Sequence, residues 1–141
     1  MKRLVACLLI VMFFVSGCGR TETQQDKIFR LVEKHYDTIV KACQEKDVET
    51  LCAIQGVTSV NIVEGYVVVF CKGTGIAPSS HDYGFYYSEE NIPAMVDCNQ
   101  TPYASPEDYT PMGNGYQKIV QENVFYTEQI KGNLYFYSNA Y

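Results

Sequence analysis

The sequence predicts an α+β domain, in which an N-terminal amphipathic helix and a short second helix pack on an antiparallel meander sheet of about five to six strands. Three observations lead to this prediction. Apolar residues recur at helical spacing between residues 27 and 43, a period of two replaces that spacing after Gly56, and turn-forming residues separate the later apolar segments. Helices that precede a series of closely connected strands are typical of a helical layer on one face of such a sheet.

The first helix is expected to begin at Asp26, whose carboxylate suits a helix cap or a first turn. Its apolar side chains fall on one face, which would lie against the sheet. They belong to Ile28, Leu31, Val32, His35, Tyr36, Ile39, Val40 and Cys43. A second helix is expected from Asp47, its cap, to Ile54, and Gly56 would end it.

Strands are expected where β-branched and aromatic residues gather between turn residues. The segments are 57–63, 66–71, 83–88, 124–130 and 134–138, with shorter ones at 94–97 and 116–120. Residues 66–71, YVVVFC, are apolar on both faces, so this strand should be central and covered on both sides. Residues 99–115 carry three prolines and should form a long irregular loop. The predicted core includes Leu31, Ile39, Val68 and Phe70.

The N-terminus has the pattern of an export signal. Lys2 and Arg3 precede an apolar run, and the small residues Ser16 and Gly17 follow it. The run is about a dozen residues long, whereas a bilayer core needs roughly 20, so we do not expect a transmembrane helix. Cys18 comes directly after Val15-Ser16-Gly17, which resembles the lipobox of bacterial lipoproteins, although Val15 stands where that motif usually has Leu.

The lipobox resemblance implies that Cys18 is lipidated and becomes the first residue of the mature protein. Ordinary secretory cleavage after Gly17 is the alternative. We therefore expect a lipoprotein signal peptide at residues 1–17, a flexible tether at 18–25 and a single domain at 26–141. The expected location is extracytoplasmic, with the lipid on Cys18 anchoring the chain to the cell membrane.

Charge and cysteine content limit the other possibilities. Removal of the signal takes away two of the eleven Lys and Arg residues, which leaves nine against sixteen Asp and Glu and a net charge of −7. An acidic chain without a basic patch is not expected to bind nucleic acid. The four remaining thiols, Cys43, Cys52, Cys71 and Cys98, lack the close pairs typical of zinc sites, so no metal or other cofactor is expected.

An extracytoplasmic location permits disulfides, and four thiols allow three pairings. Cys71 with Cys98 is the first pairing that we expect, because both would lie at the ends of neighbouring strands. The alternative is a set of free thiols, and Cys43 suits that alternative because it falls on the apolar helix face.

The most unusual connection is KGTGIAPSSHDY, residues 72–83, which offers Ser79, Ser80, His81 and Asp82 as a possible binding loop. Ser, His and Asp are also the residue types of an acyl-transfer site, but sequence neighbours rarely converge on one point, so we do not expect an enzyme. Tyr103 and Tyr109 in the long loop are the second set of candidates for an interface. The alternative for both regions is a solvated connection without a ligand.

Three segments carry a family resemblance: GYVVVFCKGTGIAPSS, DYGFYYSEENIPA and VFYTEQIKGNLYFYS. They resemble a family of small bacterial lipoproteins with no assigned activity, and the resemblance supplies no catalytic residues. The expected function is a membrane-anchored module that binds an extracytoplasmic protein or a wall component. The alternative is an inhibitor or immunity-type protein that blocks a basic secreted hydrolase or toxin through charge complementarity.

Overall fold

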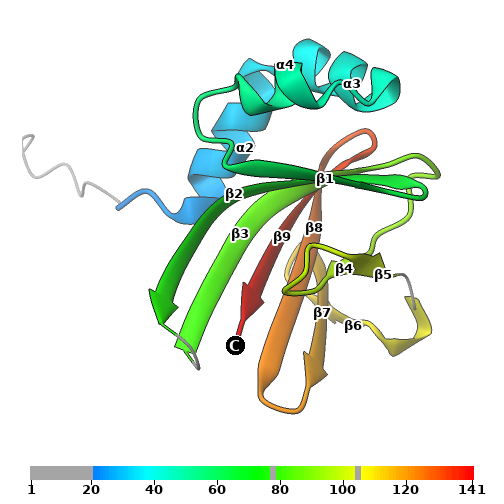
Figure 1. The fold of residues 1–141 in the computed structure, drawn as a ribbon. Coiled ribbons are helices and arrows are strands. Elements are labelled where there is room, and N and C mark those ends of the chain that lie inside the picture. The colour runs from blue at the N-terminus through cyan, green and yellow to red at the C-terminus, as the bar shows by residue number, and fades with distance from the viewer. Residues whose placement is uncertain (1–20, 77–78, 104–105) are drawn as a thin grey trace, which may run out of the picture.

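The computed structural model describes residues 21–76, 79–103 and 106–141 (Figure 1). The predicted signal and Cys18 lie outside these residues. The helices are α2 (Gln24–Lys34), α3 (Tyr36–Glu45) and α4 (Val48–Cys52), and a 3-10 turn η1 spans Pro106–Asp108. The strands are β1 (Ser59–Val63), β2 (Tyr66–Ile76), β3 (Ser79–Ser88), β4 (Met95–Val96), β5 (Pro102–Tyr103), β6 (Thr110–Met112), β7 (Gly115–Val120), β8 (Asn123–Lys131) and β9 (Leu134–Ala140).

The described residues form an α+β fold with a seven-stranded antiparallel sheet in the order β1-β2-β3-β9-β8-β7-β6, and a separate pair, β4-β5. The predicted class is confirmed, but the sheet is larger than five to six strands and is not one continuous meander. After β3 the chain leaves the sheet, passes through β4 and β5, and re-enters at the far edge as β6. The last four strands then run back until β9 pairs with β3, which makes β9 central.

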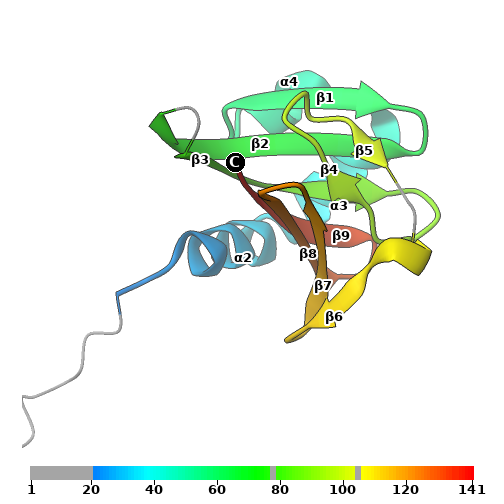
Figure 2. The ribbon, with the colours of Figure 1, turned by 90° about the horizontal axis from the view of Figure 1, so that it is seen from below.

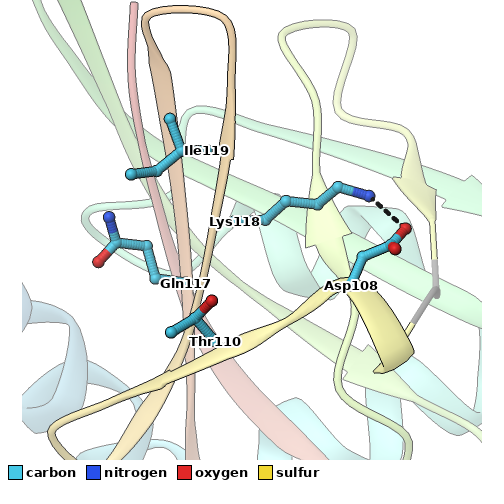
Figure 3. A pocket seen from close by; sticks show the side chains of 5 residues that line it. All are labelled: Asp108, Thr110, Gln117, Lys118 and Ile119. Atoms are coloured by element: carbon cyan, nitrogen blue, oxygen red, sulfur yellow. Dashed lines mark hydrogen bonds and ion pairs between the residues drawn. The ribbon is translucent and has the colours of Figure 1, made fainter.

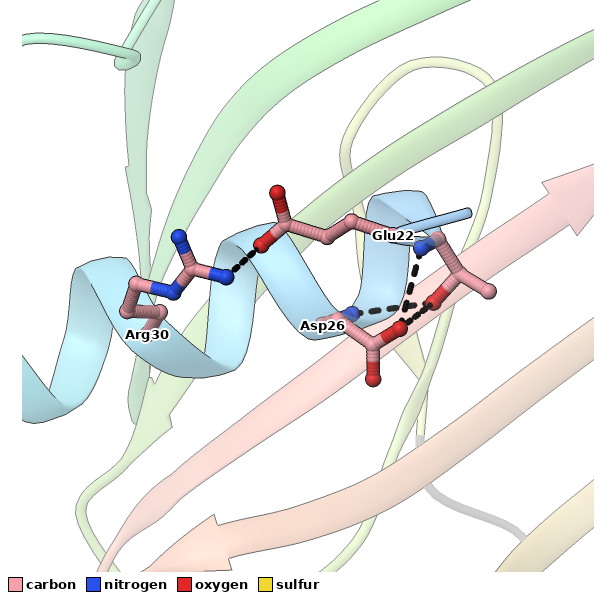
Figure 4. Close-up of polar contacts among 4 residues, drawn as sticks. Glu22, Asp26 and Arg30 are labelled. Atoms are coloured by element: carbon pink, nitrogen blue, oxygen red, sulfur yellow. Dashed lines mark hydrogen bonds and ion pairs between the residues drawn. The ribbon is translucent and has the colours of Figure 1, made fainter. Parts of the chain in front are cut away.

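The first helix begins earlier than predicted, because a capping box precedes it. The hydroxyl Oγ1 of Thr23 accepts from the backbone N–H of Asp26 at 3.1 Å, and the Asp26 carboxylate accepts from the N–H of Thr23 at 2.9 Å (Figure 4). Figure 4 also shows the ion pair between Arg30 and Glu22 beside this cap. Gln24 and Gln25, which we expected in the tether, therefore belong to α2.

The predicted single helix is divided in two at His35. This residue has φ −115° and ψ 19°, outside helical values, and α3 starts directly after it. The bend allows the apolar residues of both helices to enter one core, with Val32 from α2 and Ile39 from α3 fully buried. The second helix and its cap are confirmed, since the Asp47 carboxylate accepts from the N–H of Thr50 at 3.1 Å, but α4 ends at Cys52 rather than at the predicted Ile54.

The two faces of the sheet are covered by different segments, as Figures 1 and 2 show. We call them the helix face, on which α2 lies across β3 and β9, and the β4-β5 face. Val67 and Val69 of β2 point into the core on the helix face, and Val68 points into a second core with Ala94 and Val96. The expectation that this strand is covered on both sides is therefore confirmed. Of the other predicted core residues, Ile39 is fully buried, and Leu31 and Phe70 are half-buried.

Two predicted connections turn out to contain strands. Residues 72–76 and 79–83 extend β2 and β3 into a hairpin arm, in which Thr74 is opposite His81, and a bulge at Cys71 interrupts the register. The expected loop at 72–83 is thus mostly paired. The predicted strand at 94–97 is reduced to β4, which pairs with β5 outside the main sheet, and the expected loop at 99–115 contains β5, η1 and β6.

Candidate functional site

The four candidate residues of the arm do not converge. Successive side chains of a strand point to opposite faces, so Ser79 and His81 lie on one face of β3, and Ser80 and Asp82 lie on the other. The His81 ring stacks on Tyr83, with centroids 6.2 Å apart. A serine–histidine–aspartate geometry is therefore absent from these residues.

Of these four residues, Asp82 has a partly buried side chain whose ionisation is changed by that burial. It lies opposite Gly73 on one side and opposite Asn139 of β9 on the other, and partial burial raises the pKa of its carboxyl, an effect that His81 opposes. Ser80 contributes its carbonyl, which accepts from the backbone N–H of Tyr141 at 2.9 Å. The arm is thus joined to the C-terminal end of the sheet by backbone pairing and is part of the fold.

The second candidate pair, Tyr103 and Tyr109, is close together in space. The hydroxyl of Tyr109 donates to the carbonyl of Tyr103 at 2.9 Å and accepts from the N–H of Met95 at 3.3 Å. The Tyr103 ring makes an edge contact with Phe125 of β8, with centroids 6.3 Å apart. Both tyrosines are half-buried and hold β4 and β5 against the sheet, which places the nearby β6-β7 hairpin beside them.

An open cavity of about 550 Å³ lies next to these tyrosines, along β7 (Figure 3). It exists because β6 pairs with only the first half of β7, from Gly115 to Gln117, and the chain before Thr110 turns away into η1. Its lining residues are Asp108, Thr110, Gln117, Lys118 and Ile119. We call this cavity and its lining residues the β7 groove.

The side-chain ammonium of Lys118, which lines the groove, is held in place on two sides. Nζ of Lys118 lies 3.0 Å from Oδ2 of Asp108 and 5.4 Å from the centroid of the Tyr103 ring (Figure 3 shows the ion pair). The hydrogen bond to Asp108 raises the pKa of the Lys118 ammonium above its usual value. Lys118 therefore remains charged at neutral pH and gives the groove lining a positive charge paired with Asp108.

Exposed apolar side chains gather on the same hairpin. Of the six large apolar residues that the described part of the chain exposes, four belong to β6 and β7. They are Met112, Tyr116, Ile119 and Val120, with exposed fractions of 56%, 42%, 62% and 42%. Single exposed apolar residues are common on protein surfaces, but a group beside an open groove is typical of a docking surface.

Neither Lys118 nor Ile119 was among the candidate residues predicted from the sequence. Residues 116–120 are predicted as a strand, but only the three-dimensional register shows that, among the residues the structure describes, no strand pairs with the outer side of its second half. The adjacent apolar pair Ile119-Val120 was the available signal, since it places apolar side chains on both faces of a short strand. Tyr103, predicted from its place in a loop, does contact this region.

The four thiols of the described domain are all free. Cys43 is buried, Cys71 is half-buried, and Cys52 and Cys98 are exposed. Burial raises the pKa of both Cys43 and Cys71 to about 12. The bridge that we expected between Cys71 and Cys98 is not present in the structure, and the alternative of a buried free thiol describes Cys43.

Within residues 21–76, 79–103 and 106–141, no group of three or more His, Cys, Asp and Glu side chains has the arrangement of a metal site. None of the helices in these residues is long and apolar enough to cross a bilayer. No protein-family model matches the chain, and neither the curated proteins nor the solved structures include a significant match. The resemblance to small bacterial lipoproteins therefore stays an expectation from the sequence.

Proposed function

We propose that this chain is an extracytoplasmic lipoprotein, anchored to the cell membrane through Cys18, and that its folded domain is a binding module for another extracytoplasmic protein. The β7 groove is the proposed docking site. The observation that carries the proposal is an open cavity lined by the exposed side chain of Ile119, on a hairpin that also exposes Met112, Tyr116 and Val120. Non-polar side chains next to a fixed charge pair suit a protein surface, because protein interfaces combine an apolar centre with polar groups around it.

The anchor is supported by the sequence of residues 1–18 and by the position at which the fold begins. The capping box fixes Thr23 at the start of α2, only five residues after Cys18. An extended chain spans at most about 3.6 Å per residue, so the tether would hold the domain within about 18 Å of the membrane surface. One acyl chain binds a membrane only marginally, so stable anchoring requires two or more chains on Cys18.

The anchor is tested by the substitution Cys18→Ser. We expect the variant either to be released from the membrane or to accumulate as an uncut precursor, as shown by fractionation and by the mass of the N-terminal peptide. Unchanged processing and unchanged membrane retention would contradict the anchor. This test does not involve the groove, so its result stands separately.

The docking site is tested by chemical cross-linking in the native envelope with a matched pair of variants. Ile119→Ser removes the apolar side chain of the groove, and Val48→Ser removes an exposed apolar side chain of α4, outside the groove. We expect the cross-linked adduct of the wild-type chain to disappear in Ile119→Ser and to remain in Val48→Ser, with both variants melting close to the wild type. An adduct that both variants retain would place the site elsewhere.

The same experiment distinguishes the inhibitor alternative. If the partner is a basic secreted hydrolase or toxin, charge complementarity would make the complex strongly sensitive to salt. We then expect the adduct to weaken steeply as the salt concentration rises and the partner's activity to be blocked in the complex. A docking contact dominated by the apolar groove would be far less sensitive to salt.

A further inference from the structure

We infer that the β7 groove binds an extended segment of the partner, which adds to the sheet as a short strand opposite Ile119. This inference rests on the proposed function, because it specifies how the groove would be occupied. It follows from the direction of the backbone groups in β7, from the register of β6 and from the side chains around the cavity. Addition of a strand to an open sheet edge is one of the recurring ways in which proteins recognise peptides.

The backbone groups of β7 alternate between its two neighbours. A two-residue turn joins β7 to β8, so its closing pair, Val120 and Asn123, exchanges both hydrogen bonds. Every second residue has the same orientation in an antiparallel strand, and Lys118 therefore also directs its N–H and C=O toward β8. Gln117 and Ile119 direct theirs to the opposite side, where β6 lies.

The register of β6 shows which of these outward groups are already used. Gln117 is opposite Thr110, the first residue of β6. Continuation of this register would place Asp108 opposite Ile119, but Asp108 belongs to η1 and its carboxylate binds Lys118 instead. The position opposite Ile119 is therefore occupied by the cavity, and no strand of the described residues pairs with β7 there.

The rest of this sheet edge is protected against strand addition. The edge strand β6 has only three residues, and its central residue, Pro111, has no N–H to donate. An added strand would thus be restricted to the part of β7 that β6 leaves uncovered. This explains why the site is a groove of limited length, suited to a short segment of a partner.

The side chains around Ile119 indicate the chemistry of that segment. A residue directly opposite Ile119 would share its face of the sheet and contact its side chain, which is 62% exposed, so an apolar residue fits there. The two flanking residues would point to the other face, toward the Lys118–Asp108 ion pair, so polar residues fit there. The chain as a whole has a net charge of −5, which favours Lys or Arg elsewhere in the segment.

The test uses proline to remove one backbone donor. Ile119→Pro deletes the outward N–H and retains an apolar side chain, and the N–H that it deletes has no partner within the sheet. Ile119→Val is the matched control, because it keeps the N–H. The probe is a pool of random ten-residue peptides displayed on phage and selected on the wild-type domain, followed by titration of the enriched peptides as synthetic copies.

We expect the enriched peptides to bind Ile119→Pro at least tenfold more weakly than wild type and to bind Ile119→Val within about threefold. We also expect saturation with peptide to slow hydrogen exchange of the Ile119 amide in the wild type at least tenfold. This second measurement decides the question if Ile119→Pro does not fold. Equal binding by the proline variant, or protection confined to other amides, would overturn the inference.

Two further outcomes would also overturn it. Failure of the pool to yield any peptide that protects Ile119 would show that the groove does not take an added strand. Self-association of the domain that protects Ile119 without peptide would show that a second copy is the occupant. The two proposals can fail separately. Loss of the envelope adduct in Ile119→Ser, together with its retention in a folded Ile119→Pro, would keep the groove as the docking site and exclude strand addition. Retention of the adduct in Ile119→Ser would instead contradict the docking site itself.

Discussion

Gln25 and Glu128, 103 residues apart in the sequence, join the start of the first helix to the sheet. Nε2 of Gln25 donates to Oε2 of Glu128 at 2.7 Å, and the same carboxylate oxygen accepts from the hydroxyl of Tyr126 at 2.7 Å. Glu128 is only 8% exposed, so these donors replace water that the carboxylate has lost. The contact fixes α2 on the sheet at the end from which the N-terminal segment leaves.

Truncation of Glu128 is therefore expected to destabilise the fold. Glu128→Ala leaves the half-buried Gln25 amide and Tyr126 hydroxyl without their acceptor, and the loss of each hydrogen bond is expected to cost about 0.5–1.5 kcal/mol. Glu128→Gln keeps an acceptor oxygen in place and should cost less. The free energy of unfolding from denaturant titration measures both variants, and equal losses would show that the hydrogen bonds are not the cause.

Two buried tyrosines provide a matched comparison on the β4-β5 face. The hydroxyl of Tyr86 lies 2.7 Å from Oγ1 of Thr127 and accepts from the N–H of Ala94 at 2.8 Å, whereas the hydroxyl of Tyr137 has no hydrogen-bond partner among the residues that the structure describes. Both residues are almost completely buried. The same Tyr→Phe substitution therefore removes a used hydroxyl at one position and an unused one at the other.

We expect Tyr86→Phe to lower the free energy of unfolding by about 1–3 kcal/mol, since it leaves the Ala94 N–H unsatisfied. Tyr137→Phe should be neutral or stabilising, because it removes a buried polar atom that lacks a partner. Thermal melting and denaturant titration of the two variants measure the difference. A greater loss for Tyr137→Phe than for Tyr86→Phe would contradict the hydrogen-bond assignment.

The local features of this fold could be predicted from the sequence, because they depend on neighbouring residues. The Asp47 cap and the strand with apolar residues on both faces both appear in the structure. The capping box could also have been found, since Thr23 and Asp26 have the required spacing. The helix break at His35 had no comparable signal, because the apolar spacing continues through it.

The arrangement of the strands could not be predicted, because it depends on pairing between distant segments. The turn after β8 predicts that β8 and β9 pair, but nothing near Leu134 indicates that it also lies opposite Tyr87 of β3. The same limit applies to the groove. Ile119 is exposed at an open edge only because β6 does not begin until Thr110, and this is a matter of register rather than composition.

The four thiols of the domain are expected to differ in reactivity. The exposed Cys52 and Cys98 should be alkylated rapidly in the native protein, the half-buried Cys71 more slowly, and the buried Cys43 only after unfolding. Burial disfavours the reactive thiolate at the latter two positions, where it raises the pKa to about 12. Peptide mass mapping after brief alkylation without reduction measures each site. Protection of Cys98 together with Cys71 would contradict the free thiols and support the bridge predicted from the sequence.

Stability is expected to fall at alkaline pH for the same physical reason. Burial raises the pKa of the Cys43 thiol from its ordinary value of 9.0 to about 12, so the folded protein holds this proton more tightly than the unfolded chain does. The contribution of the protonated Cys43 thiol to the free energy of unfolding is complete below pH 9 and is lost as the pH rises from 9 toward 12. Burial also raises the pKa of Tyr126 and Tyr141 from 10.0 to about 12, which adds to the loss above pH 10.

Cys43→Ala isolates the contribution of the thiol. This variant should be less stable than the wild type at pH 8, because it loses a buried sulfur, but its stability should decrease less steeply above pH 9. One titrating group changes the free energy of unfolding by about 1.4 kcal/mol per pH unit between its two pKa values, so the curves of the wild type and the variant should converge. Guanidinium titrations at intervals from pH 8 to pH 10.5 measure this convergence. Curves that stay parallel across this range would show that the Cys43 thiol ionises as easily in the fold as in the unfolded chain.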